Sequence, residues 1–174
     1  MAHLLLTVIG ADRPGLVRTL AETVAAHGGS WLESRMGRLA GQFAGIVLVD
    51  APDSLLSDLQ ALEGQGLRIS VQNALEQEAA PAVAPRLALE VVGNDRPGIV
   101  RDITRILWDC GVNIEEFVTG VAEGSFTGGT LFRVTAMLRV PNADAVKAVR
   151  AGLEELGNEL MVDIQPAPEG TPLT

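Results

Sequence analysis

The sequence is poor in the residues from which catalytic and metal sites are built. It contains one cysteine, Cys110, and two histidines, His3 and His27. A single cysteine excludes an internal disulfide and is typical of a reducing compartment. No histidine, cysteine and carboxylate residues occur at metal-ligand spacing, and no nucleophile accompanies a base and an orienting group. We therefore expect a non-enzymatic protein without metal or cofactor.

Positive charge is also scarce. The chain carries 22 acidic and 13 basic residues, a net charge of −9, and no lysine or arginine cluster. Such a chain repels phosphate backbones, so direct nucleic-acid binding is disfavoured. No apolar run approaches the roughly 18 residues of a membrane-spanning helix. The apolar start has no basic residue before Arg13, unlike a signal peptide. We expect a cytoplasmic protein that contacts neither membrane nor nucleic acid.

Aromatic residues make up only 3% of the chain, against 47% hydrophobic residues in total, which predicts an aliphatic globular core. An RNA-recognition domain needs aromatics on its central strands, and Leu4–Ile9 and Leu87–Val92 carry none. An acylphosphatase-type enzyme needs a glycine-rich phosphate cradle, which is absent beside Arg13. The segment Gly124–Gly129 fits neither a dinucleotide fingerprint nor a P-loop, and we interpret it as part of a hairpin turn.

One ten-residue motif is present twice. Residues 9–18 read IGADRPGLVR and residues 92–101 read VGNDRPGIVR, an offset of 83 positions. A repeat of this length indicates duplicated domains rather than a solenoid. Each copy follows an apolar run and precedes a helical pattern, so the chain has two similar halves.

Each half predicts the order βαββαβ, from apolar periodicity bounded by glycine and proline. In the first half we expect strands at 3–9, 31–39, 43–49 and 67–71, with helices from Pro14 and Ser54. In the second we expect strands at 87–92, 112–121, 130–140 and 159–164, with helices after Pro97 and at 142–156. The fold class is α+β, with two tandem ferredoxin-like units whose antiparallel sheets carry helices on one face. The domains are 1–75 and 86–165, joined by an Ala/Pro-rich linker at 76–85 and followed by a tail at 166–174.

The repeated motif describes a strand-to-helix turn. Gly10 ends the apolar strand, Asp12 precedes a proline suited to the first helical position, and an Asp there can accept from free N–H groups. Gly15 leaves no Cβ over the first helical turn, so a carboxylate or phosphate can approach the exposed amides. Two interpretations stay open: a capped turn that binds nothing, and a ligand site. The counterparts in the second half are Gly93, Asp95, Pro97 and Gly98.

Three further repeat pairs carry polar side chains. Asn113, at a strand start, offers donors and an acceptor, and its counterpart Ser30 is shorter; either is a turn residue or a ligand contact. Glu33 and Glu116 follow the helix-to-strand turn. They are either solvated carboxylates at a strand end or residues that bind the amino group of a ligand. The third pair, His27 and Cys110, occupies the helix end, where we expect a structural role.

Each half resembles the ACT domain, a βαββαβ module that binds small metabolites and regulates enzymes or transcription. The resemblance lies in the D-R-P-G-[LI]-V-R motif, the helix that follows it and then Gly-X-[SN]-[WI]-X-E. Residues 3–165 with two such units resemble the glycine cleavage system transcriptional repressor family. The resemblance implies an effector between domains, held by the strand–helix turn of one and the Gly-X-Asn strand start of another. The residues implicated are Gly10, Asp12, Pro14, Gly15 and Ser30 in the first half, and Asn94, Asp95, Gly98, Ile99 and Asn113 in the second.

The resemblance implies a regulator that senses a small amino acid, with glycine as the expected effector, and that restrains transcription through a protein partner. The alternative is an amino-acid-responsive regulatory subunit of a biosynthetic enzyme. Of the two half-sites we expect the second to be better, because the Asn113 amide and the free amides of Gly98 and Ile99 can act together. Free sheet edges must be paired or covered, so we also expect a homodimer.

Overall fold

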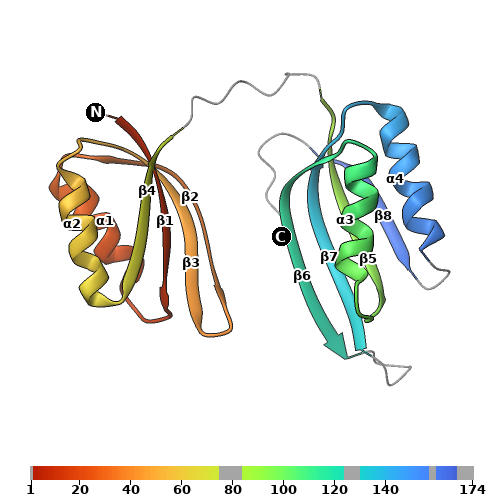
Figure 1. The fold of residues 1–174 in the computed structure, drawn as a ribbon, viewed down its shortest axis with the longest axis horizontal. Coiled ribbons are helices and arrows are strands. Elements are labelled where there is room, and N and C mark those ends of the chain that lie inside the picture. The colour runs from red at the N-terminus through yellow and green to blue at the C-terminus, as the bar shows by residue number, and fades with distance from the viewer. Residues whose placement is uncertain (1, 75–83, 124–129, 157–159, 168–174) are drawn as a thin grey trace. The chain divides into compact units, whose positions relative to one another are not determined.

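The computed structural model describes residues 2–74, 84–123, 130–156 and 160–167. The chain divides into two compact units, Met1–Glu78 and Ala79–Thr174. Each unit has the order βαββαβ, as the duplicated motif predicts (Figure 1). The prediction of two tandem α+β units is therefore confirmed.

The first unit follows the predicted elements with one change, in its second helix. Its elements are β1 (Ala2–Ala11), α1 (Leu16–Ala26), β2 (Ser30–Leu39), β3 (Gln42–Ala51), α2 (Leu55–Ala61), the 3₁₀ helix η1 (Leu62–Gln65) and β4 (Leu67–Asn73). The α-helical part of the second helix is seven residues long, and four residues of tighter 3₁₀ helix follow it. Gly66 then ends the helix in the left-handed conformation, with φ of 83°.

The second unit repeats this pattern with a longer second helix. Its elements are β5 (Arg86–Asn94), α3 (Ile99–Asp109), β6 (Asn113–Glu123), β7 (Thr130–Arg139), α4 (Ala143–Glu155) and β8 (Met161–Pro166). Either Asn142 or Asp144 could start the second helix from the sequence; helix α4 begins after Asn142, whose side-chain oxygen accepts from the Ala145 amide at 2.9 Å. Strand β8 continues two residues past its predicted end at Ile164 and includes the first residue of the expected tail.

Each unit contains one four-stranded antiparallel sheet. The strand order is β2-β3-β1-β4 in the first unit and β6-β7-β5-β8 in the second, so the first strand of each unit lies between two partners. Both helices of a unit pack on the same face of its sheet (Figure 1). This arrangement leaves one open face and two edge strands in each sheet.

Alternation along the central strands determines which face carries the core. In β1 the residues that point toward the helices are fully buried, and in β5 the corresponding residues are buried as well: Leu4, Leu6 and Val8, and Leu87, Leu89 and Val91. Helices α1 and α3 contribute apolar residues at helical spacing to the same cores: Leu16, Leu20 and Val24, and Ile99, Ile103 and Leu107. Both cores are aliphatic, as the composition predicts.

Three predicted segments lie largely outside the described residues. They are residues 76–83 of the linker, the hairpin turn at 124–129, and residues 168–174 of the tail. The boundaries of linker and tail therefore stay predictions. Among the described residues, no helix is both long and apolar enough to span a membrane.

Candidate functional site

The first strand–helix turn contains two glycines with different roles. Gly10 lies so close to the neighbouring strand that a Cβ atom there would stand 2.6 Å from the Gly66 carbonyl oxygen. Gly15 has φ of 94° and is the N-cap residue of α1. No described residue lies within 4 Å of the position its Cβ would occupy. Gly10 is thus required for packing, whereas Gly15 leaves the positive end of α1 accessible to a small anion.

Asp12 and Pro14 do not take the capping positions predicted from the sequence. The N-cap residue is Gly15, so Pro14 lies in the turn before the helix rather than in its first position. The Asp12 carboxylate instead pairs with the Arg38 guanidinium, at 2.7 Å, and its backbone N–H donates to the Gly41 carbonyl, at 2.9 Å. Asp12 therefore fastens the turn to the β2–β3 hairpin and does not satisfy the amides of the helix.

The second turn has the same backbone and is more crowded. Gly98 is the N-cap residue of α3, with φ of 86°, but a Cβ there would lie 3.1 Å from an Arg101 side-chain nitrogen. The Ile99 amide, predicted to be free, donates to the Arg96 carbonyl at 3.3 Å. The guanidinium of Arg101 therefore covers the position at which an anion would approach Gly98.

Asp102 holds the arginines of this second turn in place. One carboxylate oxygen accepts from Arg96 at 2.8 Å, and the other accepts from Arg101 at 2.9 and 3.0 Å. Hydrogen bonds from Arg96 and then Arg101 lower the pKa of Asp102, and outweigh the opposing effect of burial. We call Arg96, Asp102 and Arg101 the aspartate clamp. Sequence reasoning missed this clamp. Its signal was that the repeat offset aligns the ionisable Asp102 with the neutral Thr19.

In the first unit Thr19 stands at the position of Asp102, and the corresponding arginines have other partners. Arg13 donates to the Gln65 carbonyl at 2.6 Å, and Arg18 pairs with Glu22 at 2.7 Å. The same motif therefore makes an unobstructed turn in the first unit and a clamped turn in the second.

Asn94 and Asp95 lie at the mouth of the clamped turn. Asn94 is the last residue of β5, and both side chains are exposed. The Asp95 backbone N–H donates to the Thr130 carbonyl at 2.8 Å, the equivalent of the bond that Asp12 makes. Asp95 thus ties its turn to the start of β7.

The structure does not bring the strand starts and the turns of one unit together. Asn113 pairs with Arg139 on β7, whereas Asn94 pairs with Leu131 on the same strand. Eight residues of antiparallel strand separate those partners, about 27 Å at about 3.4 Å per residue. Ser30 lies likewise at the far end of the first sheet, opposite Asp50. Gly98 and Asn113 of one unit therefore cannot hold the same small ligand, and the expected site, formed by the turn of one unit and the strand start of another, stays a prediction.

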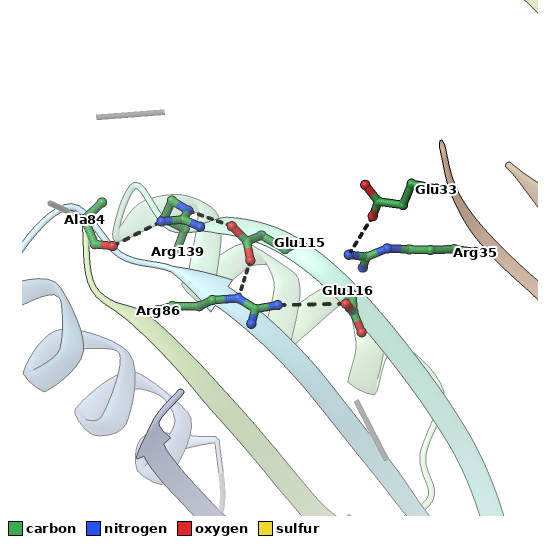
Figure 2. Close-up of polar contacts among 7 residues, drawn as sticks. All are labelled: Glu33, Arg35, Ala84, Arg86, Glu115, Glu116 and Arg139. Atoms are coloured by element: carbon green, nitrogen blue, oxygen red, sulfur yellow. Dashed lines mark hydrogen bonds and ion pairs between the residues drawn. The ribbon is translucent and has the colours of Figure 1, made fainter. Parts of the chain in front are cut away.

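Close to Asn113, whose strand partner is Arg139, lies a partly buried ionic cluster that sequence reasoning missed (Figure 2). Glu115 accepts from Arg86 at 2.7 Å and from Arg139 at 2.6 Å, and Glu116 lies 3.9 Å from Arg86. The Arg86 side chain is only 5% exposed. Arg139 also donates to the Ala84 carbonyl, at 3.3 Å. The cluster therefore connects the start of β5 to β6, to β7 and to Ala84, two residues before β5.

A β-bulge positions Glu115 in this cluster. The register of β6 against β7 shifts between Ile114 and Glu116, so Glu115 is the extra residue. The first unit has the same bulge, where the extra residue is Leu32, 47% exposed. Burial alone would raise the pKa of Glu115, but hydrogen bonds from the two arginines outweigh it and lower the pKa. The sequence held one signal for the cluster: the repeat offset aligns Arg86 with His3, so the two halves differ in charge at this position.

The remaining polar candidates take structural positions. His27 and Cys110 are the C-cap residues of α1 and α3. The His27 ring lies 3.0 Å from the Thr23 carbonyl, and burial, with Asp109 nearby, raises the pKa of the Cys110 thiol. Glu33 lies 3.7 Å from Arg35, also in Figure 2. No group of three metal-ligating side chains occurs in the part of the chain that the structure describes.

The βαββαβ order of both units agrees with a comparison against models of known protein families. The model of the ACT domain matches residues 2–76 and 86–166. The chain belongs to the ACT-domain family. Its two ACT units together cover nearly all of the described residues.

Two solved structures and one curated protein are similar to this tandem ACT chain. An unknown protein from Galdieria sulphuraria is 29% identical, with a TM-score of 0.82, over 96% of this chain and 99% of that one. A candidate glycine cleavage system transcriptional repressor has a TM-score of 0.67 over 95% and 98% of the two chains, and its 16% identity supports the fold alone. The glycine cleavage system transcriptional repressor of Escherichia coli K12 is 25% identical over 121 residues, 67% of this chain and 64% of that protein. The matched region thus spans about two thirds of the length of that curated relative.

Proposed function

We propose that this tandem ACT protein is a non-enzymatic regulator that binds a small amino acid, glycine in the first instance, and modulates transcription through a protein partner. The observation that carries the proposal is the unobstructed turn at Gly15, where a left-handed N-cap glycine leaves the positive end of α1 accessible. The similarity to the Escherichia coli repressor supports the transcriptional role.

The effector carboxylate binds at the start of α1 in this proposal. Backbone N–H groups at a helix N-terminus suit a carboxylate, and the absence of a side chain at Gly15 lets the ligand approach them. Asp12 is held by Arg38 at 2.7 Å, at the edge of the turn, where its carboxylate can attract the ammonium group. Ser30 lies at the other end of the same sheet, so it contacts this effector only if it comes from a different ACT unit.

The second turn binds more weakly in the same proposal. Arg101 covers Gly98, and Asp102 already occupies both arginines with a carboxylate of its own. An effector carboxylate must displace that internal one. This proposal reverses the order expected from the sequence, in which Asn113 together with the amides of Gly98 and Ile99 favoured the second half-site.

The affinity of glycine has a physical upper bound. Glycine has about five heavy atoms, and the best small ligands gain about −1.5 kcal/mol per atom, so the dissociation constant cannot fall much below the low micromolar range. That range suits a sensor of a metabolic pool. A thermal-shift screen of the common amino acids, followed by calorimetric titration, tests which of them binds.

The decisive variant is Gly15→Ala, with Gly28→Ala as its control. Both glycines have positive φ, 94° and 68°, and no described residue lies near either Cβ position. The two substitutions therefore impose similar backbone strain, but only the first places a methyl group at the turn. We expect Gly15→Ala to abolish titratable binding and Gly28→Ala to retain it. Equal affinities for the two variants would show that the turn is not the site.

The partner mechanism has its own test. With a net charge of −9, the purified protein alone should shift no DNA fragment in a salt-sensitive, sequence-dependent manner. Affinity capture from the native host should recover a transcription factor. Recovery of a biosynthetic enzyme instead would favour the alternative role as a regulatory subunit, and a sequence-dependent shift by the chain alone would count against a partner.

A further inference from the structure

The second sheet carries a hollow on its open face, opposite the face on which α3 and α4 lie in Figure 1. The volume of this hollow is about 410 Å³, within the range of small-molecule sites. In β5 the core residues Leu89 and Val91 point toward the helices, so the residues that alternate with them point to the open face. The lining includes side chains from three strands of this one unit: Glu90 and Val92 of β5, Leu131 and Arg133 of β7, and Met161 and Asp163 of β8.

Two carboxylates of the hollow face each other across neighbouring strands. Glu90 on β5 is the register partner of Asp163 on β8, so the Cβ atoms of the two lie on one face about 4.5–5.5 Å apart. Like charges in this position are destabilising. The Asp163 carboxylate accepts from the Gln165 amide at 2.7 Å, but within the described parts of the chain it forms no ion pair. A cation bound beside Asp163 would therefore relieve a repulsion that the sheet itself leaves in place.

An arginine and an apolar strip complete the hollow. The Arg133 guanidinium lies 3.5 Å from Glu90, longer than a close charge-assisted hydrogen bond, and the Arg133 side chain is 65% exposed. Its N–H groups are therefore available to an anion. Val92 lies between Arg133 and Met161, its register partners on β7 and β8, and Met161 is 70% exposed. Opposite charges thus stand close together at one side, and an apolar strip leads from them toward β8.

The first sheet lacks these charges at the equivalent positions. Thr7 and Ser70 form the cross-strand pair that corresponds to the two acids, and both are neutral. Ala44 stands at the position of the arginine, and Arg68 at that of the methionine. Both sheets keep the same strand order, so the ACT fold does not require the charged hollow. It is a feature of the second unit.

We propose that this hollow binds a basic amino acid, a zwitterion with a second ammonium group at the end of an aliphatic stem. The close pair of Arg133 and Glu90 matches the adjacent carboxylate and ammonium of an amino acid. The stem crosses β5 over Val92, and the terminal ammonium reaches Asp163, the carboxylate without an ion pair among the described residues. Each charge of the ligand then meets one of opposite sign.

This site is separate from the strand–helix turns and does not depend on the proposed glycine site. It lies on the open sheet face, whereas the unobstructed turn belongs to the first unit. The charged side chains of the hollow are largely solvated, and exposed ion pairs are weak. We therefore expect a dissociation constant on the order of 1 mM for a basic amino acid.

Amide NMR titration of the full chain with L-lysine tests the ligand chemistry. Lysine should shift the backbone amides of β5, β7 and β8 around Glu90, and the amides of the first sheet serve as the internal control. Norleucine keeps the amino-acid head and an aliphatic stem without the terminal ammonium, and cadaverine keeps both ammonium groups without the carboxylate. Each should bind at least about threefold more weakly than lysine, the effect of losing one exposed ion pair. Cadaverine binding as tightly as lysine would indicate simple attraction of cations and would overturn the assignment.

Charge-removing variants locate the site. Asp163→Asn should weaken lysine binding at least about threefold and leave norleucine binding unchanged, whereas Arg133→Gln should weaken both. Ser70→Asn, at the position in the first sheet equivalent to Asp163, is the matched control and should change neither.

Gly15→Ala separates this proposal from the proposed function. The variant blocks the turn that should bind glycine, but it should bind lysine as the parent does. Lysine shifts that are absent at about 20 mM, well above the expected constant, overturn the proposal. So does unchanged lysine affinity in Asp163→Asn, or a hollow that responds to a lysine-containing peptide and not to the free amino acid.

Discussion

At the start of the first strand the two ACT units carry different residues, His3 in one and Arg86 in the other. Arg86 is buried and donates to Glu115, which also accepts from Arg139, whereas His3 is exposed and lies opposite Asp50 on the neighbouring strand. Both units keep the same sheet order and the same bulge. The duplicated fold thus depends on its apolar positions, and the polar ends of the sheet are free to diverge.

The strand–helix turns diverge in the same manner. The second unit has Asp102 where the first has Thr19, and Arg105 where the first has Glu22. The arginines of the motif contact the Gln65 carbonyl and Glu22 in the first unit and share the Asp102 carboxylate in the second. One turn is left accessible and the other is filled by the chain itself. A duplicated motif therefore does not imply two equivalent ligand sites.

The largest expected effect is the loss of stability when the ionic cluster of the second unit is broken. Glu115→Ala leaves the buried Arg86 without its main carboxylate, and should cost about 3 kcal/mol of stability, since breaking one partner of a buried pair is strongly destabilising. Leu32→Ala, at the equivalent bulge of the first unit, should cost less than about 1 kcal/mol because this leucine is largely solvated. Denaturant unfolding with hydrogen exchange resolved to β6–β7 and β2–β3 measures both. Equal losses of stability in Glu115→Ala and Leu32→Ala would show that the ionic cluster does not stabilise the second unit.

Acid should affect the second unit through the same group. The pKa of Glu115 is lower in the folded unit than its ordinary value of 4.5, so its stabilising contribution is complete above that value. The contribution is lost as the pH falls through the folded-state pKa. Hydrogen exchange in β6 and β7 should accelerate as the solution is acidified below about 4.5. Glu115→Gln should remove this dependence, and a Glu115→Gln chain with the parent's acid profile would contradict the assignment.

Exchange of the residues at the clamp position should exchange the properties of the two turns. Thr19→Asp places a carboxylate within reach of the first turn's arginines and should weaken effector binding about tenfold, about 1.4 kcal/mol. Asp102→Thr should release Arg101 from Gly98 and strengthen binding at the second turn. Calorimetric titration of the single variants and of the double exchange measures both changes. Unchanged affinity in Thr19→Asp would show that the clamp does not control access.

The sequence predicts the backbone well because the relevant signals are local. Apolar periodicity and glycine positions identify the strands and α-helices of both described units, whereas the choice of Asn142 over Asp144 as the cap of α4 comes from the structure. The clamp and the cluster depend on side-chain directions instead. Asp12 pairs with Arg38 across a hairpin, and Glu115 reaches Arg86 only because a bulge turns it. Neither contact follows from spacing along the chain, although the repeat alignment marks where the charges of the two halves differ.

The smallest expected effect concerns the N-termini of the second helices. Asn142 accepts from the Ala145 amide at 2.9 Å, whereas Ser54 makes no side-chain cap bond to α2. Asn142→Ala should therefore cost about 1 kcal/mol, the usual value of a lost cap, and Ser54→Ala only a few tenths. Both residues precede the second helix of their unit, but the backbone is extended at Asn142, with φ of −165°, and helical at Ser54, with φ of −60°, so the difference reports the cap bond together with the backbone geometry that permits it. Denaturant midpoints at constant m measure it, because a change in m would indicate a different unfolded state. A Ser54→Ala cost as large as that of Asn142→Ala would mean that the serine caps α2 in solution, and that the two helix starts are alike.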